Sequence, residues 1–487
     1  MTFTPNDFLA LLPEIILATM ALVVLLVGLF IRADGRRWLA WLSLVSVVGA
    51  LAATLWTPTF TEPMVQGMLR VDVLGKFLNV VFLLGSGFTL MLSADYLERQ
   101  GAASGEYYTL ILFATLGAML MGSSADLLMI FLGLETLSIP LYILSSFFRH
   151  QPASQEAGFK YFLLGSFSSA LLLYGVALVY GATGTTQLIA LSDAVSGALA
   201  AKPLLLYAGA GLLLVGLSFK SAAVPFHTWA PDVYEGAPTS TTAFMAVAAK
   251  AGAFAAFIRV FADPFLEFAP SWAILVGAIA ALTMILGNLV AVVQTNLKRL
   301  LAYSSIAHAG YLLIGVAAAQ TPALAADATS GLLFYLLVYT LMTLGAFGVV
   351  MLAEGRGENL SLDDVAGMAW TSPGLGTAMA IFMISLAGLP PTAGFFGKFY
   401  IFRSAIEADL LWLAIIGVVT SVVSVYYYLR VVYTMVMRPA ETERSVFNSR
   451  LAWVGLTIMA VGILLLGVYP TLAYGWLGEW ATLAALP

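Results

Sequence analysis

Long apolar runs, separated by short groups of glycine, proline and charged residues, recur from one end of the chain to the other. A helix needs about 20 apolar residues to cross the hydrocarbon core of a bilayer. Counted with a window of about 19 residues, the pattern predicts about fourteen spanning helices and hence an all-α polytopic membrane protein. The predicted spans begin near Leu9, Trp38, Val73, Tyr107, Leu127, Ala157, Leu204, Pro238, Trp272, Leu300, Leu332, Gly374, Leu411 and Leu451.

Three segments need a separate interpretation. The run from Ile15 to Ile31 follows no basic stretch and carries no small-residue cleavage site, so we expect a retained helix rather than a secretory signal. The alternation and β-branched residues between Met64 and Phe77 predict a short hairpin at the membrane surface. The pattern from Leu188 to Ala201 favours a surface helix over a span.

Composition supports a membrane environment and narrows the chemistry. The chain is 61% hydrophobic and 10% charged, whereas soluble domains carry about 25% charged residues. It has no cysteine, which excludes disulfides, thiolate metal sites and cysteine-bound iron-sulfur clusters, so any redox centre must lie in a partner. The three histidines do not cluster and predict no metal site. The net charge is −5 and no basic patch with interleaved aromatic residues occurs, so nucleic acid is not an expected partner.

The basic residues predict the orientation, because arginine and lysine gather in cytoplasmic loops. If the N-terminus lies outside, one set of alternate loops holds most of them, and the opposite loops hold far fewer. The first set is Arg32, Arg36, Arg37, Arg99, Arg149, Lys160, Lys298, Arg299, Arg356, Arg438, Arg444 and Arg450, and the second is chiefly Arg70, Lys76, Lys202, Arg259 and Arg403. We therefore expect both termini on the outer side and an even number of spans.

Four charged residues stand inside predicted spans, namely Glu135, Lys220, Lys250 and Lys398. A charge at the bilayer centre costs about 2.5 to 3.5 kcal/mol on insertion scales, so each is a candidate for function. The alternative is a structural ion pair, or a side chain that reaches the interface from the end of a helix.

Helix-breaking residues accompany two of these lysines. Pro225 follows Lys220, and Pro390 and Pro391 precede Lys398. Proline frees backbone carbonyls, which at membrane depth must be satisfied by protein or water. We therefore predict two discontinuous helices, and paired breaks of this kind point to an ion pathway built on inverted repeats. Two ordinary proline kinks are the alternative.

The charge on a buried lysine depends on burial, which disfavours the ammonium, and on a nearby carboxylate, which favours it. We expect Glu135 and Lys220 to form a pair. Formation of the pair would favour protonation of the lysine, and its separation would favour release of the proton. His227 and His308 lie at or inside spans and suit either a proton relay or buried hydrogen bonding. His150 ends a span and is expected to be an interfacial cap, and Asp232 and Glu235 are expected at the interface.

Three segments resemble the antiporter-like membrane subunits of respiratory complex I and of Mrp cation/proton antiporters: LKRLLAYSSIAHAGY, FKSAAVPFHTWAPDVYEGAPT and FLGLETLSIPLYIL. The resemblance covers nearly the whole chain. Within this family the opening LLPEIILA is similar to subunit N. Lysine at position 398 departs from the subunit M pattern, and the short tail after Tyr474 departs from subunit L.

The resemblance implies fourteen helices with two inverted five-helix repeats. The expected divisions are an N-terminal three-helix segment with the surface hairpin, a first repeat, a second repeat and a C-terminal helix, at residues 1–105, 106–265, 266–438 and 439–487. It also implies a proton path whose residues match Glu135, Lys220, Lys250 and Lys398, with His227 and His308 as further members.

The same resemblance implies proton transport coupled to the transfer of electrons from NADH to quinone. No cofactor is then expected in this chain, and FMN, iron-sulfur clusters and quinone belong to partner subunits. The implied partners are other membrane subunits, including a neighbouring antiporter-like subunit, and membrane lipid. The implied location is the bacterial inner membrane. Alternatives are a subunit of a cation/proton antiporter, a scaffold whose charges only lock helices together, and a solute transporter.

Overall fold

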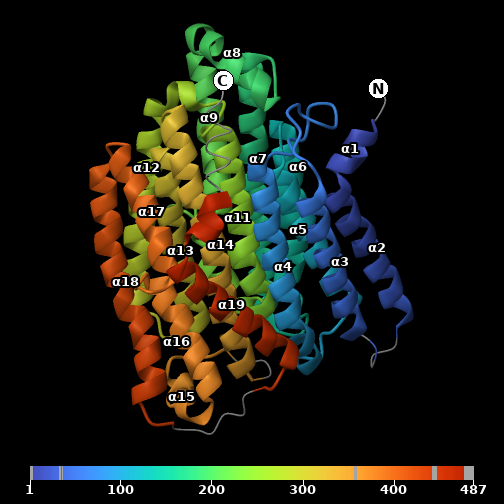
Figure 1. Cartoon of the computed structure of the whole chain (residues 1–487), viewed down its shortest axis with the longest axis vertical. Coiled ribbons are helices and arrows are strands. Elements are labelled where there is room, and N and C mark those ends of the chain that lie inside the picture. Colours follow the sequence, from blue (N-terminus) through green and yellow to red (C-terminus); the bar gives the residue numbers. More distant parts are fainter. Residues whose placement is uncertain (1–3, 32–34, 36, 356–358, 441–446, 477–487) are drawn as a thin grey trace.

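The computed structural model describes residues 4–31, 35, 37–355, 359–440 and 447–476. Within these ranges the chain forms a helical bundle whose helices run mainly along its long axis (Figure 1). The helices before the first break are α1 (Pro5–Ala10), α2 (Leu12–Phe30), α3 (Arg37–Trp56), α4 (Val73–Arg99), α5 (Gly105–Gly122), α6 (Leu127–Ser145), α7 (Pro152–Thr183), α8 (Leu188–Ala201) and α9 (Pro203–Lys220). Those after it are α10 (Trp229–Gly236), α11 (Thr239–Phe261), η2 (Leu266–Phe268), α12 (Ala269–Val292), α13 (Leu297–Ala318), α14 (Pro322–Ala353), η3 (Asp363–Val365), α15 (Met368–Thr371), α16 (Pro373–Ala387), α17 (Ala393–Glu407), α18 (Leu411–Met437) and α19 (Arg450–Val468).

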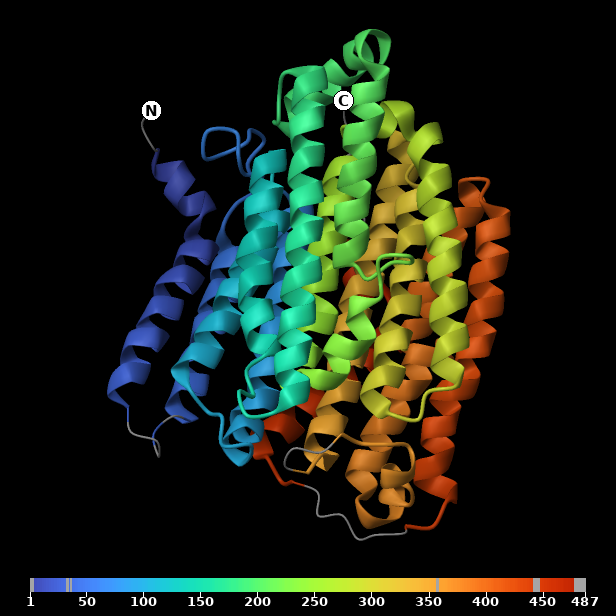
Figure 2. The same ribbon diagram turned by 180° about the vertical axis from the view of Figure 1, so that it is seen from behind.

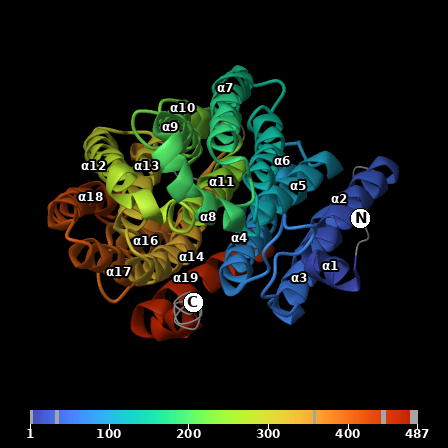
Figure 3. The same ribbon diagram turned by 90° about the horizontal axis from the view of Figure 1, so that it is seen from above.

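Three helices form the centre of the bundle. The apolar stretch of α11 is entirely buried, and those of α13 and α14 are 94% buried. Figure 3 shows α11 and α14 inside, with α2, α3, α7, α12 and α18 around them. The outer helices carry exposed apolar side chains such as Leu26, Phe159 and Val422, which suit contact with lipid. Their backbone groups are hydrogen-bonded within each helix, so they need no partner from the lipid. The all-α, multi-pass membrane architecture predicted from the sequence is confirmed.

Twelve helices in the described part of the chain are long and apolar enough to cross a membrane, or thirteen if the bent pair of η3–α15 and α16 counts as one span. The predicted count of fourteen, the two inverted repeats and the four divisions of the chain stay predictions. Four of the basic residues used to predict orientation, Arg32, Arg36, Arg356 and Arg444, lie outside the described residues, as do residues 441–446 and 477–487 of the expected C-terminal division.

Both predicted helix breaks are present. The first separates Lys220, the last residue of α9, from Trp229, the first of α10, and the second separates Ala387 of α16 from Ala393 of α17. Figure 2 shows the first break as the green turn about halfway along the bundle. Its freed backbone finds partners within the protein, since the N–H of Val224 donates to Thr283 Oγ1 at 2.9 Å. Irregular backbone at membrane depth is tolerated where such partners exist.

Two surface elements lie at the end of the bundle that is uppermost in Figure 1. The predicted surface helix is confirmed as α8, with the expected bounds. The predicted hairpin is shorter than expected. Met64 and Leu69 exchange two backbone hydrogen bonds of 2.7 and 3.1 Å, but α4 already begins at Val73. Asp72 is the N-cap of α4, because its side chain accepts a hydrogen bond from the N–H of Gly75 at 2.7 Å.

Candidate functional site

Four of the predicted side chains are almost completely buried. Lys220 is 4% exposed, Lys250 2%, Lys398 4% and His308 1%. None of the ion pairs found among the described residues includes any of these three lysines. Their partners are hydroxyls, backbone carbonyls and aromatic rings, as the following paragraphs describe. The structure therefore does not support a role for these lysines as members of structural ion pairs.

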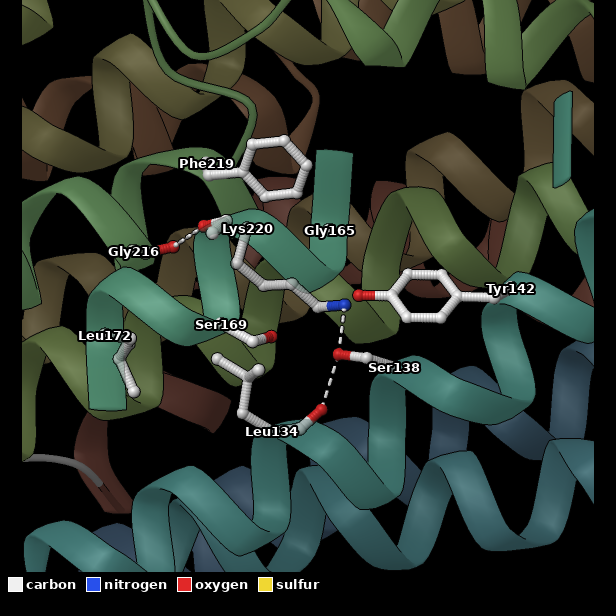
Figure 4. Close-up of a pocket in the computed structure, with 10 residues that line it drawn as sticks. Leu134, Ser138, Tyr142, Gly165, Ser169, Leu172, Gly216, Phe219 and Lys220 are labelled. Carbon is white, nitrogen blue, oxygen red and sulfur yellow. Dashed lines mark hydrogen bonds between the residues drawn. The ribbon is translucent and has the colours of Figure 1, made fainter. Parts of the chain in front are cut away.

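Lys220 stands at the end of α9, where the helix stops before Pro225, and it points toward α6 and α7. Its Nζ donates to Ser138 Oγ at 2.7 Å and to the hydroxyl of Tyr161 at 3.1 Å. It also lies 5.8 Å from the ring centre of Tyr142. Figure 4 shows the side chain at the edge of a small cavity that Ser138, Tyr142 and Ser169 line. The cavity measures about 10 Å³, which is room for one water molecule.

Glu135 precedes Ser138 by one helical turn, so both lie on the same side of α6. The carboxylate is half-buried, and its Oε1 makes no hydrogen bond. The predicted direct pair with Lys220 is not formed in this structure, because the ammonium binds Ser138 and Tyr161 instead. Glu135 is still near enough to act on the charge of Lys220. Glu135 thus lies one turn of α6 from Ser138, the serine that contacts the Lys220 ammonium.

Lys250 lies midway along the buried helix α11. Its Nζ donates to Ser305 Oγ at 2.7 Å and also to the backbone carbonyl of Ser305 on α13. The hydroxyl of Tyr339, on α14, donates to the same Ser305 Oγ at 2.8 Å. The ammonium is 5.2 Å from the ring centre of Tyr339. Lys250 thus connects the three central helices through one serine.

His308 follows Ser305 by one turn of α13 and is hydrogen-bonded through both ring nitrogens. Nδ1 is 2.6 Å from the hydroxyl of Tyr335, and Nε2 is 3.0 Å from that of Tyr428. The Tyr428 hydroxyl is also 2.5 Å from Ser304 Oγ. Neutral imidazole donates through one nitrogen and accepts through the other, so the ring can pass a proton between the two tyrosines by changing tautomer.

Lys398 lies on α17 beside the second break. Its Nζ donates to the carbonyl of Ala387 at 2.9 Å and to Ser421 Oγ at 2.8 Å. Ala387 ends α16, so this carbonyl is one of those that the break leaves free, and a helix C-terminus favours a positive charge. The ammonium also lies 5.0 Å from the ring centre of Tyr311, which itself contacts the His308 ring at 5.6 Å.

These contacts arrange the predicted residues in two groups. Lys250, His308 and Lys398 are joined by serines and tyrosines in the second half of the chain, and Glu135 and Lys220 form a separate group in the first. Aromatic rings connect the groups, because Tyr161 stacks on Trp229 at 4.4 Å and Trp229 meets Tyr234 edge to face at 6.2 Å. The hydroxyl of Tyr234 lies beside Ser305.

The remaining predicted residues lie outside both groups. His227 is half-buried within the first break, and its Nδ1 makes no hydrogen bond. His150 is exposed, as expected for an interfacial residue. Asp232 and Glu235 are also interfacial, since both pair with the partly exposed Arg299, at 2.9 and 2.7 Å. Among the described residues, no group of three or more histidine, aspartate or glutamate side chains could hold a metal ion.

Sequence reasoning missed the hydroxyl groups that contact the lysines and His308. A signal for them exists, since several stand one helical turn from a predicted site residue. Ser138 follows Glu135, Ser304 and Ser305 precede His308, and Tyr335 and Tyr339 share one face of α14. Serine and tyrosine are common in membrane helices, however, and only the packing of the helices shows which of them face the lysines.

Comparison with known proteins places these features in a family. The family described as "NADH:quinone oxidoreductase/Mrp antiporter, TM" matches residues 124–424. NADH-quinone oxidoreductase subunit N of Trichlorobacter lovleyi is 46% identical over 95% of this chain and 94% of that protein. The protein of the same name from Myxococcus xanthus is 44% identical over 97% of both chains.

Solved structures show the same relationship. A chain of respiratory complex I from Thermus thermophilus is 36% identical, with a TM-score of 0.79 over 95% of this chain and 98% of that one. A chain of the Mrp complex from a Dietzia species shares the fold, with a TM-score of 0.85 and 22% identity over 99% and 97% of the two chains. The chain therefore belongs to the subunit N family of NADH-quinone oxidoreductase, within the membrane subunits that complex I and Mrp antiporters have in common.

Proposed function

We propose that this chain carries protons across the membrane as subunit N of an NADH-quinone oxidoreductase, driven by electron transfer in partner subunits. The observation that carries the proposal is the set of three buried lysines, Lys220, Lys250 and Lys398, whose ammonium groups contact only neutral partners in the described part of the chain. A buried charge with neutral partners is costly, so such a lysine can release its proton far more readily than one held in an ion pair.

Each residue has a role in this proposal. Glu135 adjusts the proton affinity of Lys220, and Lys250 is the central carrier, which exchanges protons with His308 through serine and tyrosine hydroxyls. Lys398, beside the second break, is the last carrier before release. His227 lies in the first break and could exchange protons with water there. The two inverted repeats, over residues 106–265 and 266–438, would place one broken helix in each repeat, with Lys220 beside the break of the first and Lys398 beside the break of the second.

The assignment also implies partners and a location. The chain has no cysteine, so we assign FMN, the iron-sulfur clusters and the quinone site to partner subunits. The partners are other membrane subunits, among them a neighbouring antiporter-like subunit, and the chain acts as part of a translocase without its own redox site. Relatives of this family in bacteria support the inner membrane as the location. The basic residues support an orientation with both termini outside.

The proposal is tested by changing Lys220→Ala in the complete reconstituted complex. We expect proton pumping driven by NADH to be lost, or to fall at least about tenfold, because a proton carrier has been removed. Pumping, NADH oxidation and assembly of the complex are measured together. Lys202→Ala is the matched control, since Lys202 is exposed and its Nζ binds only the carbonyl of Gly181 among the hydrogen bonds found.

The two outcomes separate the proposal from its alternative. Loss of pumping in an intact complex supports a coupled proton path through Lys220. Undiminished pumping by the Lys220→Ala complex would instead favour the scaffold role, in which the charges only hold helices together.

A further inference from the structure

Asn288 is a buried polar residue to which the pathway proposed above gives no role. It is 1% exposed and lies on α12, which packs against both α13 and α18 (Figure 3). Its Nδ2 donates to the backbone carbonyl of Met284 at 2.8 Å and to the hydroxyl of Tyr311 at 3.1 Å. Its Oδ1 accepts a hydrogen bond of 3.0 Å from the hydroxyl of Tyr427. The amide therefore connects α12 to one tyrosine on α13 and one on α18.

The carbonyl of Met284 determines which way the amide of Asn288 points. A backbone carbonyl can only accept a hydrogen bond, so the amide atom that faces it must be the nitrogen. The oxygen then faces Tyr427, and the second N–H faces Tyr311. The hydrogen-bond network thus defines this orientation without reference to hydrogen positions.

This orientation also determines the role of the Tyr311 hydroxyl. Because it accepts from the amide N–H, its own proton must point to another acceptor. Thr420 Oγ1 on α18 lies 3.5 Å away and is suited to accept, since its proton is donated to the carbonyl of Ile416 at 2.8 Å. Tyr311 is thus held at its hydroxyl end by a donor from α12 and an acceptor from α18.

Close contact between α12 and α13 keeps Asn288 and Tyr311 in place. A Cβ on Gly287, which precedes Asn288, would lie 2.7 Å from the backbone nitrogen of Ala307. A Cβ on Gly310, which precedes Tyr311, would lie 2.8 Å from the backbone nitrogen of Met284. Each helix therefore approaches the backbone of the other directly beside the amide-to-tyrosine hydrogen bond, which leaves the two residues little room to separate.

The ring of Tyr311 contacts the predicted proton carrier of the second break. The Nζ of Lys398 lies over this ring, 5.0 Å from its centre, and the ring of His308 meets it edge to face at 5.6 Å. The face of an aromatic ring attracts an ammonium group electrostatically, and a neutral amine lacks the charge for this attraction. The contribution of Tyr311 therefore depends on whether Lys398 carries its proton.

We propose that Asn288 is a positioning residue for Lys398, which it influences by holding the ring of Tyr311 over the ammonium group. With the ring in place the protonated lysine is stabilised, so Lys398 is loaded for a larger share of each cycle. Without the amide the hydroxyl of Tyr311 loses its donor, and the ring is no longer held in that position. Asn288 itself neither gives nor takes a proton. This inference rests on the proposed function, since it concerns the loading of one carrier in that pathway.

The first experiment replaces Asn288→Leu in the complete reconstituted complex. Leucine has a similar size but no hydrogen-bonding group, so we expect the number of protons pumped per NADH oxidised to fall about two- to tenfold, the range of a lost cation–π contact. Assembly and thermal stability of the complex are measured in parallel. Gln320→Leu is the matched control, because this amide also donates to a backbone carbonyl, that of Ala317 at 3.1 Å, but contacts no tyrosine among the hydrogen bonds found.

The second experiment asks whether Asn288 acts through Tyr311. Tyr311→Phe keeps the ring and removes only the hydroxyl, so it breaks the same hydrogen bond from the other side. We expect it to lower the proton yield as much as Asn288→Leu does, and the double variant to be no worse than either single one. Asn288→Gln keeps both amide donors and should recover part of the yield, which a residue that only fills space would not require.

Three results would overturn the proposal. They are an unchanged proton yield in Asn288→Leu, losses that multiply in the double variant, and equal losses in the glutamine and leucine variants. Multiplied losses would mean that Asn288 acts through another partner, such as Tyr427. An unchanged yield in Asn288→Leu beside a poor yield in Lys398→Ala would leave Lys398 standing as a carrier. A normal yield in Lys398→Ala would instead overturn the carrier itself, and the proposed role of Asn288 with it.

Discussion

Each of the three lysines of the candidate site has a serine as a close partner: Ser138 for Lys220, Ser305 for Lys250 and Ser421 for Lys398. A serine hydroxyl both accepts and donates a hydrogen bond. It can therefore accept from the ammonium and, after the proton has left, donate to the free amine. Neither protonation state then leaves the buried nitrogen without a partner, which lowers the cost of changing between them.

A prediction at this scale concerns the exchange Lys398→Arg. Arginine keeps the positive charge but does not lose its proton in proteins. If Lys398 carries protons, the arginine variant should pump at least about tenfold more slowly than the parent complex, as a Lys398→Ala variant should. Pumping by both variants is measured after their assembly has been checked.

The arginine variant is informative because it separates charge from proton exchange. Full pumping by Lys398→Arg together with loss in Lys398→Ala would show that only a fixed positive charge is needed at the second break. The space is limited, since a Cβ on Gly388 would lie 2.7 Å from Lys398 Cδ, so a second variant, Ser421→Ala, keeps the test independent of side-chain size. It should slow pumping while leaving the lysine in place.

At the scale of helices, close packing of α5 against α6 fixes the position of Glu135 and Ser138. A Cβ on Gly117 of α5 would lie 2.3 Å from the backbone nitrogen of Leu137, and one on Gly133 of α6 would lie 2.9 Å from the carbonyl oxygen of Gly117. Both obstructions are backbone atoms, which cannot turn away. The two glycines therefore allow the helices to approach closely, as small residues do in membrane helix pairs.

We predict that Gly117→Ala destabilises the subunit by about 1 to 3 kcal/mol, because the added methyl group forces the helices apart. The measurement is the thermal stability of the purified complex. The temperature at which this subunit is lost from the complex reports on the subunit itself. Gly197→Ala is the control, since a Cβ at this position on α8 would have no neighbour within 4 Å. Comparable stability of the two variants would show that α5 and α6 can move apart freely.

The helices themselves were largely predictable from the sequence, because the apolar runs that lipid requires are long and the breaks carry proline. Val73, Leu127 and Leu411, for example, begin helices where predicted. The start of α14 was misplaced, since it begins at Pro322 and not near Leu332. The first part of this helix, PALAADATSG, contains polar residues that hydropathy scores as loop, although the packing of the bundle keeps it helical.

The site was predictable in its charged members but not in its contacts. A lysine within a span stands out in any sequence, whereas the pairing of Lys220 with Ser138 in place of Glu135 depends on how α9 meets α6 and α7. Distances across helices depend on side chains from several elements, such as the ring of Tyr161 that occupies one side of the ammonium. The packing of the helices sets these distances, and the periodicity of residues along one helix does not determine that packing.

At the scale of the whole molecule, the distribution of basic residues predicts which end faces the cytoplasm. The lower end in Figure 1, where α15 lies, adjoins the loops rich in arginine, and the upper end carries α8. Basic side chains resist transfer across the membrane, so the arginine-rich end is expected to stay inside. The direction of the proposed proton transport depends on this orientation, since uptake and release would exchange sides if the bundle were inverted.

The orientation is tested with two single cysteines in the otherwise cysteine-free chain, Thr371→Cys at the lower end and Gly197→Cys on α8 at the upper end. Thr371 is exposed, and Gly197 has open space around it, so neither variant should disturb packing. A membrane-impermeant maleimide should label Thr371→Cys in inverted vesicles and Gly197→Cys in right-side-out cells. The reverse pattern would place the basic end outside and overturn the proposed orientation, with uptake and release of protons then on the opposite faces.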